Sequence, residues 1–222
     1  EEIKKEETKE VGVFTDVNAA VAAAKKAQQQ LFRMTLADRK RITDCIRNEV
    51  GGHVEELSKM TVEETKMGRV EDKIEKNKAA LYNTPGIEDL PSSVFSGDRG
   101  LTLLELSPFG VIGSITPSTN PTETVICNCL GMICAGNSVV FSPHPGAYKV
   151  TNYTVKLINQ AIAKAGGPEN LVVTLSEPSL EKSNELMHHP DIRMLVATGG
   201  PAIVKTVLSS GKKAIGAGAG NP

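Results

Sequence analysis

The second half of the chain alternates short apolar runs with helix-like stretches, and this rhythm constrains the fold more than any other feature. The runs are apolar nearly throughout, so both faces of each strand are expected to be buried. Such strands, separated by helices, are typical of a parallel sheet covered on both sides. The sequence therefore predicts an α/β fold with a doubly wound, Rossmann-like parallel sheet of about five strands. The expected strands are GVIGSITP (110–117), SVVFS (138–142), LVVTL (171–175), RMLVAT (193–198) and KAIGA (213–217).

Helices are expected between these strands and throughout the first part of the chain. We expect a charged tail over residues 1–10, a helical layer over 11–95, an extended arm over about 96–108, and the sheet-forming part over 109–222. The helices between strands are predicted at about 122–135, 147–165, 179–189 and 201–209.

Local signals place the first helices. Asp16 is expected to cap a helix that ends near Phe32, and Thr35 with Asp38 resembles a capping box. Helical spacing then continues from Ile42 as far as Leu57. A further helix is predicted from Val62 to Leu81, with Met67 on its inner face.

Composition excludes several classes of protein. The formal net charge is −1, with hydrophobic residues at 40% and charged residues at 23%. A nucleic-acid partner would require a clustered basic face, which the sequence does not have. No apolar run approaches the roughly 20 residues of a membrane-spanning helix, so no membrane partner is expected. Four cysteines without an even framework indicate reduced thiols in a cytoplasmic compartment.

Three of the cysteines lie close together in CNCLGMIC. At about 100° per residue on a helix, Cys127 and Cys134 share a face while Cys129 points nearly opposite. They cannot converge on one ion, so no metal site is expected. The apolar surroundings indicate buried structural thiols.

Four loops are expected at the carboxyl ends of the strands, where such sheets bind ligands. They are TPSTNP (116–121), SPHPGA (142–147), ATGGPA (197–202) and GAGAGNP (216–222). Each is also what an ordinary strand-to-helix turn looks like. In ATGGPA, Gly200 and Pro201 could start a helix whose free N–H groups bind phosphate, or simply start a helix.

Two further features of these loops have alternative interpretations. The amide of Asn120 could donate to a developing oxyanion, or the residue could form a turn before Pro121. The alternating glycines of GAGAGNP could cradle a phosphate or form one wall of an active site.

Taken in order, the loops resemble the CoA-acylating branch of the aldehyde dehydrogenase family. The matching segments extend from about residue 12 to residue 222, and they are specific in combination rather than singly. They include GVIGSITPSTNPTET, GNSVVFSPHPGA, MHHPDIRMLVATGGPAIVK and SGKKAIGAGAGNP.

The resemblance implies a fold, a reaction and a set of site residues. Residues 11–222 would be a truncated NAD-binding domain, and the reaction would be aldehyde + CoA + NAD⁺ to acyl-CoA + NADH. Asn120 takes the position of the oxyanion-hole asparagine. The residues expected to border the NAD cofactor are Thr116, Pro117, Ser118, Thr119, Ser142, Pro143, His144, Pro145, Thr198, Gly199, Gly200, Ile203 and Gly218.

The resemblance also implies that two catalytic side chains of the family, the nucleophilic cysteine and the general-base glutamate, are absent from residues 1–222. The family's nucleophilic cysteine falls beyond the equivalent of Pro222, so the 222-residue chain alone is expected to be inactive. Hydrolytic relatives have a general-base glutamate at the position of Gly216, which has no side chain to activate water. Acyl transfer to CoA is therefore expected in place of hydrolysis.

The resemblance further implies partners and a location. The expected substrates are a small aldehyde and CoA, and the full-length protein is expected to form a homo-oligomer. The cytoplasm, or the interior of a bacterial microcompartment with its shell and lumen proteins, is the expected setting. The alternative is a non-catalytic dinucleotide-binding or scaffolding module. An unrelated dinucleotide-binding protein has little support, since no G-x-G-x-x-G motif follows the first strand.

Overall fold

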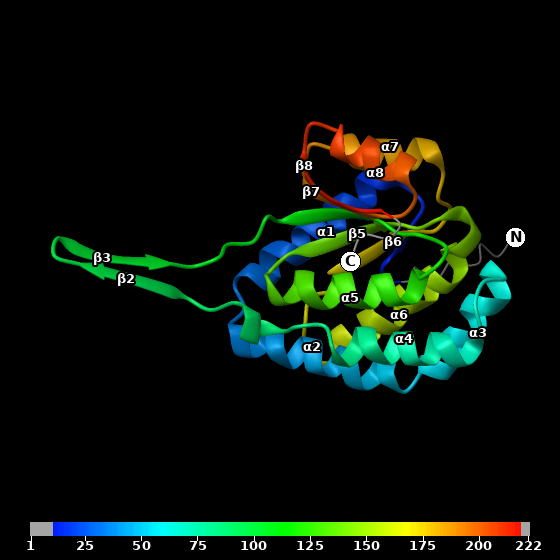
Figure 1. Cartoon of the computed structure of the whole chain (residues 1–222), viewed down its shortest axis with the longest axis horizontal. Helices are drawn as coiled ribbons and strands as arrows, with labels where there is room; N and C mark the ends of the chain where they lie inside the picture. Colours follow the sequence, from blue (N-terminus) through cyan, green and yellow to red (C-terminus); the bar gives the residue numbers. More distant parts are fainter. Residues whose placement is uncertain (1–10, 219–222) are drawn as a thin grey trace, which may run out of the picture.

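A six-stranded parallel sheet forms the centre of the molecule, and the computed structural model describes residues 11–218 (Figure 1). The strands lie in the order β1-β6-β5-β4-β7-β8, and every neighbouring pair is parallel. The Rossmann-like fold is thereby confirmed, with one strand more than expected. The strands are β1 (Val13–Phe14), β4 (Val111–Ile115), β5 (Ser138–Ser142), β6 (Val172–Leu175), β7 (Ile192–Thr198) and β8 (Lys213–Ala217).

The additional strand is β1, at the edge of the sheet beside β6. It contains only two residues, and two residues are too few to show a periodicity in sequence. The five predicted strands are all present, and β8 forms the opposite edge of the sheet. Three of them, β4, β5 and β6, are buried at every position.

Helices cover both faces of the sheet, and a further helical layer lies outside one of them (Figure 1). On one face lie α5 (Pro121–Cys134) and α6 (Tyr148–Lys164). On the other face lie α1 (Val17–Phe32), α7 (Leu180–His188) and α8 (Pro201–Leu208). The outer layer packs on α5 and α6, and it consists of α2 (Leu36–Gly51), α3 (Val54–Thr65) and α4 (Val70–Tyr82). The first helix therefore belongs with the sheet, unlike the three that follow it.

Side-chain caps fix the starts of several helices. Asp16 accepts a hydrogen bond from the Ala19 N–H at 2.7 Å, and Thr35 and Asp38 form the reciprocal capping box, both as predicted. The carboxylate of Glu64 caps α6 from another element, since it accepts from the N–H groups of Lys149 and Val150. This last contact joins the outer helical layer to the layer on the sheet.

The boundaries within the outer layer differ from those predicted. The sequence predicted continuous helical spacing from Ile42 to Leu57, but α2 ends at Gly51 and α3 begins at Val54. The helix predicted from Val62 to Leu81 is interrupted after Thr65, where Lys66 and Gly68 both have positive φ. Met67 was predicted to face inward and is 43% exposed. The apolar spacing continues across the break, so periodicity alone could not reveal it.

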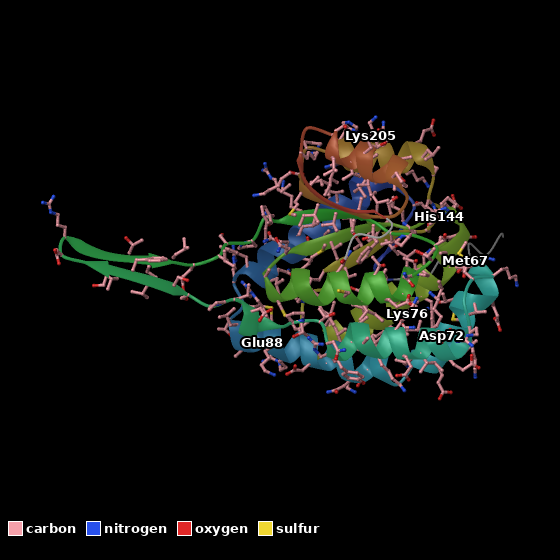
Figure 2. All side chains as sticks on the ribbon, viewed as in Figure 1. Met67, Asp72, Lys76, Glu88, His144 and Lys205 are labelled. Carbon is pink, nitrogen blue, oxygen red and sulfur yellow. The ribbon has the colours of Figure 1, made fainter. Side chains whose placement is uncertain are left out.

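A two-stranded antiparallel hairpin extends far from the body (Figure 1). It is formed by β2 (Ser93–Gly97) and β3 (Gly100–Leu104), and the single turn η1 (Ile87–Asp89) precedes it. Glu88 of η1 lies at the base of the hairpin (Figure 2). The first hairpin strand thus begins at Ser93, inside the range that the sequence assigned to the helical layer (11–95). A second single turn, η2 (Pro145–Ala147), precedes α6.

Gly12 allows β1 to dock on the sheet. Its φ is +86°, and an added Cβ would lie 2.4 Å from Nδ2 of Asn159 and 3.0 Å from the carbonyl oxygen of Val172. These two groups are hydrogen-bonded to each other at 2.6 Å in the interior. A side chain at position 12 would therefore displace a buried hydrogen bond.

We expect Gly12→Ala to destabilise the protein more than Gly166→Ala. Both glycines have positive φ, which costs an L-residue about 1–2 kcal/mol, but Gly166 has no atom near the added Cβ. Overpacking should cost Gly12→Ala about 1–3 kcal/mol more. Thermal unfolding of the two variants measures the difference. Equal melting temperatures would show that β1 does not dock as described.

Candidate functional site

The carboxyl ends of four neighbouring strands surround a cavity of about 1130 Å³. The chain passes from β4 to β5 on one side and later to β7 on the other, so the strand order reverses beside β4. Crevices at such reversals are where open α/β sheets bind ligands. Neighbouring loops are joined at the rim, because the Thr116 N–H donates to the Ser142 carbonyl and the Gly199 N–H to the Ala217 carbonyl.

All fourteen residues proposed from the sequence line this one cavity. They come from the ends of β4, β5, β7 and β8 and from the start of α8. His144 lies at the end of the molecule opposite the hairpin, which is the end to which the strands point (Figure 2). They are Thr116, Pro117, Ser118, Thr119, Asn120, Ser142, Pro143, His144, Pro145, Thr198, Gly199, Gly200, Ile203 and Gly218.

One wall of the cavity was missed by the sequence reasoning, and it is formed mainly by α7. Ser183 of α7 shares a hydrogen bond of 2.8 Å with the hydroxyl of Ser142. No sequence signal marks this wall, because α7 looks like an ordinary capped surface helix and only the fold brings it beside β5. The remaining lining residues that were not predicted are Ile115, Leu180, Glu181, Asn184, Met187, Thr206 and Ala217.

A buried hydroxyl in the cavity wall lacks a partner. Thr116 is 2% exposed, and its Oγ1 has no hydrogen-bond partner within the described part of the chain. A buried polar atom is normally paired, so the unpaired hydroxyl fits a site completed by a polar ligand. The ligand groups suited to it are hydroxyl, phosphate and amide.

The start of α8 offers a second polar feature, a set of backbone N–H donors. Gly200 occupies the N-cap and Pro201 the first helical turn, and no side chain caps this end. The free N–H groups and the positive end of the helix dipole there suit an anion. An added Cβ at Gly200 meets nothing within 4 Å, so the approach to this helix end is open.

Asn120 lies where the large cavity meets a second hollow. This hollow has a volume of about 540 Å³ and is lined by α4, by α5 and by Thr198. Asn120 and Thr198 line both spaces. A group bound in one hollow and a group bound in the other could therefore meet at the Asn120 amide.

The cysteines of α5 differ from one another in exposure. Cys129 and Cys134 are buried, as predicted, and burial raises the pKa of both thiols. Cys127 was also predicted to be buried, but it is exposed and lines the smaller hollow. The reason is that α2 covers the end of α5 near Cys134, whose thiol contacts Thr43, while Cys127 borders open space. Within residues 11–218, no three His, Cys, Asp or Glu side chains are arranged to hold a metal ion.

Gly216 lies in β8 with its missing side chain directed at α8. An added Cβ would lie 2.7 Å from Cγ1 of Val204 and 3.4 Å from Cγ of Leu208. Close packing of β8 on α8 is therefore one reason for glycine here, which the sequence could not show. Asn221 and Pro222, which also carried the sequence match, lie outside the described residues.

A Rossmann-like sheet with a cavity at its carboxyl edge is typical of the dinucleotide-binding α/β class of proteins. The model of the aldehyde dehydrogenase family matches residues 8–217. A CoA-propanoylating propanal dehydrogenase of Citrobacter freundii is 50% identical over 218 residues, covering 98% of this chain and 47% of that protein. The chain thus spans about half the length of the curated relatives it matches.

Two solved structures agree closely with the fold. A propionaldehyde dehydrogenase from the fucose utilisation bacterial microcompartment of Clostridium phytofermentans has a TM-score of 0.94 at 52% identity, covering 96% of this chain and 49% of that one. A propionaldehyde dehydrogenase of Rhodopseudomonas palustris, solved with bound CoA, has a TM-score of 0.92 at 60% identity, covering 95% of this chain and 48% of that one. The chain belongs to the aldehyde dehydrogenase family, and the resemblance seen in the sequence is confirmed.

We expect the thiols of α5 to react at different rates with iodoacetamide. The thiolate is the reactive form, and burial both raises the pKa of Cys129 and shields it. Cys127 should be alkylated faster than Cys129 by about tenfold or more, measured by mass spectrometry of peptides from the native protein. In urea the two rates should converge. Equal rates in the native protein would contradict the exposure described above.

Proposed function

We propose that the whole protein to which this chain belongs is an NAD-dependent, CoA-acylating aldehyde dehydrogenase. It would convert a small aldehyde, CoA and NAD⁺ into acyl-CoA and NADH, with this chain supplying the cofactor-binding part. The single observation that carries the proposal is the convergence of all fourteen expected residues on one cavity at the carboxyl edge of the sheet.

The cavity has two features that suit NAD. The uncapped start of α8 offers backbone N–H groups to the pyrophosphate, next to Thr198 and Gly199. The unpaired hydroxyl of Thr116 offers a further polar contact. When bound, NAD⁺ supplies the acceptor for the hydride that leaves the aldehyde carbon.

Asn120 is proposed to stabilise the oxyanion. The resemblance assigns the attacking cysteine to a segment outside residues 1–222, so the chain alone is expected to be inactive. When that thiolate adds to the aldehyde carbonyl, the carbonyl oxygen gains negative charge. The amide of Asn120, at the junction of the two hollows, is the donor proposed to meet that charge. Loss of hydride leaves a thioester, and the thiol of CoA then takes the acyl group.

The choice of CoA over water is proposed to follow from Gly216. Hydrolytic relatives have a glutamate at this position, and glycine has no carboxylate with which to deprotonate water. A general base contributes roughly 10²–10⁴-fold, so hydrolysis of the thioester should be slow. The packing of β8 on α8 is compatible with this role, since it also requires a small residue.

The hairpin is proposed to join copies of the whole protein into a homo-oligomer. Its large apolar side chains are exposed on the described chain, and a hairpin alone is marginally stable in water. Among them are Val94, Phe95, Leu101, Leu103 and Leu104. No helix of residues 11–218 is long and apolar enough to span a bilayer. The proposed location is the cytoplasm, within a bacterial microcompartment such as that of the Clostridium phytofermentans relative.

We expect the whole protein to form acyl-CoA and very little free acid. With propanal, NAD⁺ and CoA, chromatography should detect propanoyl-CoA in step with NADH. Without CoA, acid should form more slowly by about 10²-fold or more, because no general base activates water. Steady acid formation near the CoA-dependent rate would contradict the proposal. NAD binding without any product would favour the non-catalytic dinucleotide-binding module.

We expect Gly200→Asp to weaken NAD binding by on the order of tenfold or more. The new carboxylate would stand beside the pyrophosphate and repel it. Gly131→Asp is the matched control, because Gly131 is also open around its Cβ but lies outside the cavity. The dissociation constants of the whole protein, measured by fluorescence titration, make the comparison. Unchanged affinity in Gly200→Asp would mean that the phosphate site lies elsewhere.

A further inference from the structure

A buried ion pair between Lys73 and Glu123 contacts the side chain of Asn120. Lys73 of α4 is 3% exposed and Glu123 of α5 is 8% exposed, and Nζ of Lys73 lies 3.2 Å from Oε1 of Glu123. The other carboxylate oxygen of Glu123 accepts from the hydroxyl of Thr122 at 3.0 Å. A buried ammonium is costly unless it is fully paired, so its surroundings indicate what it does.

All three hydrogens of the Lys73 ammonium have acceptors. One acceptor is Glu123, the second is the backbone carbonyl of Thr119, and the third is Oδ1 of Asn120, at 3.1 Å. An ammonium has three donors and no acceptor, so its capacity is complete. Two of its three partners belong to the loop between β4 and α5.

A second lysine reinforces the same orientation. Lys76, which lies between the ribbons of α4 and α5 (Figure 2), donates to Oδ1 of Asn120 at 3.3 Å. The oxygen and nitrogen of an amide exchange places when the group rotates by half a turn. The flipped orientation would set the NH₂ group against two ammonium groups, donor against donor. The lysines therefore hold Oδ1, and Nδ2 is left for a ligand in the hollows that Asn120 lines.

The side chain of Asn120 does not cap the helix that it precedes. It occupies the N-cap of α5, where an asparagine oxygen usually accepts from the first turn of the helix. Here it makes no such cap, and its oxygen is directed to the lysines of α4 instead. The local preference is overridden, which is a common property of functional sites.

We propose that Lys73 is a positioning residue for Asn120. It holds the amide so that Nδ2 meets the developing oxyanion, and its positive charge polarises the amide, which makes Nδ2 a stronger donor. Glu123 balances the charge and so permits the ammonium to be buried. This inference rests on the proposed function, because it needs Asn120 to be the oxyanion donor.

A purely structural pair would behave differently. It would join α4 to α5, and its loss would lower stability whichever residue stood at position 120. A positioning residue acts only through Asn120, so its effect on turnover must vanish once Asn120 is removed. A double-mutant cycle separates the two roles.

The experiment uses the whole protein in two backgrounds, Asn120 and Asn120→Ala. Lys73→Met is combined with Glu123→Gln, so that neither charge is left buried without its partner, and the double variant is compared with the unsubstituted protein in each background. Lys73→Arg, which keeps the charge but moves the donors, is measured beside it. Lys78→Met is the matched control, since Lys78 lies on the same helix but pairs with Glu75 at 2.9 Å.

We expect Asn120→Ala to lower kcat on the order of 10²–10³-fold. Both Lys73 changes should lower kcat about 10–10²-fold where Asn120 is present, with KM for aldehyde and affinity for NAD unchanged. In the Asn120→Ala background, the same changes should have no further effect on kcat. Lys78→Met should leave kcat unchanged in both backgrounds.

The outcomes distinguish this inference from the proposed function. Equal losses of kcat in both backgrounds, or no loss on replacing Lys73, would overturn the positioning role while leaving Asn120 in the mechanism. An unchanged kcat in Asn120→Ala would instead remove the oxyanion assignment itself. Melting temperatures of all variants show which losses come from unfolding, and Lys73→Arg provides the test if the methionine variant does not fold.

Discussion

The burial of the central strands on both faces is the constraint on which the rest of the molecule depends. Because β4, β5 and β6 are buried at every position, each face of the sheet needs its own helices. Parallel strands also need crossovers, and those crossovers place every strand-to-helix loop at the same edge. The cavity therefore lies where the backbone must change direction in any case. The outer helices follow from this arrangement, since α5 and α6 present apolar surface on the side away from the sheet as well.

The sequence predicted well what is encoded locally. The carboxyl edge and its residues, from Thr116 to Gly218, follow from the strand-helix alternation together with the family resemblance. The caps at Asp16 and Thr35 follow from short motifs. The interruption near Gly68 did not follow, because a single left-handed turn leaves the apolar spacing on either side intact.

Lys73 could not have been found from the sequence. In VEDKIEKNK it is one of several lysines on a charged helix, and nothing local separates it from Lys76 or Lys78. Its burial arises only because α4 packs on α5, which brings it to Glu123 from a distant part of the chain. Ser183 was missed for the same reason, since its partner Ser142 is on another element. Contacts of this kind are set by tertiary packing, and they leave no repeating pattern in the sequence from which they could be predicted.

The pairing of β1 with β6 determines when the edge of the sheet can form during synthesis of the chain. Val13 pairs with Thr174, so β1 cannot form its backbone hydrogen bonds until about 160 further residues have been made. At roughly 5–20 residues per second, the ribosome needs on the order of 10–30 s to make that stretch. The apolar face of α1, which includes Val17, Val21 and Ala24, packs on β4 and β5 as well as on β6, so it stays uncovered until these strands have been made. An apolar helix face is therefore exposed on the nascent chain until β4 and β5 emerge, and β1 gains its strand partner only when β6 follows.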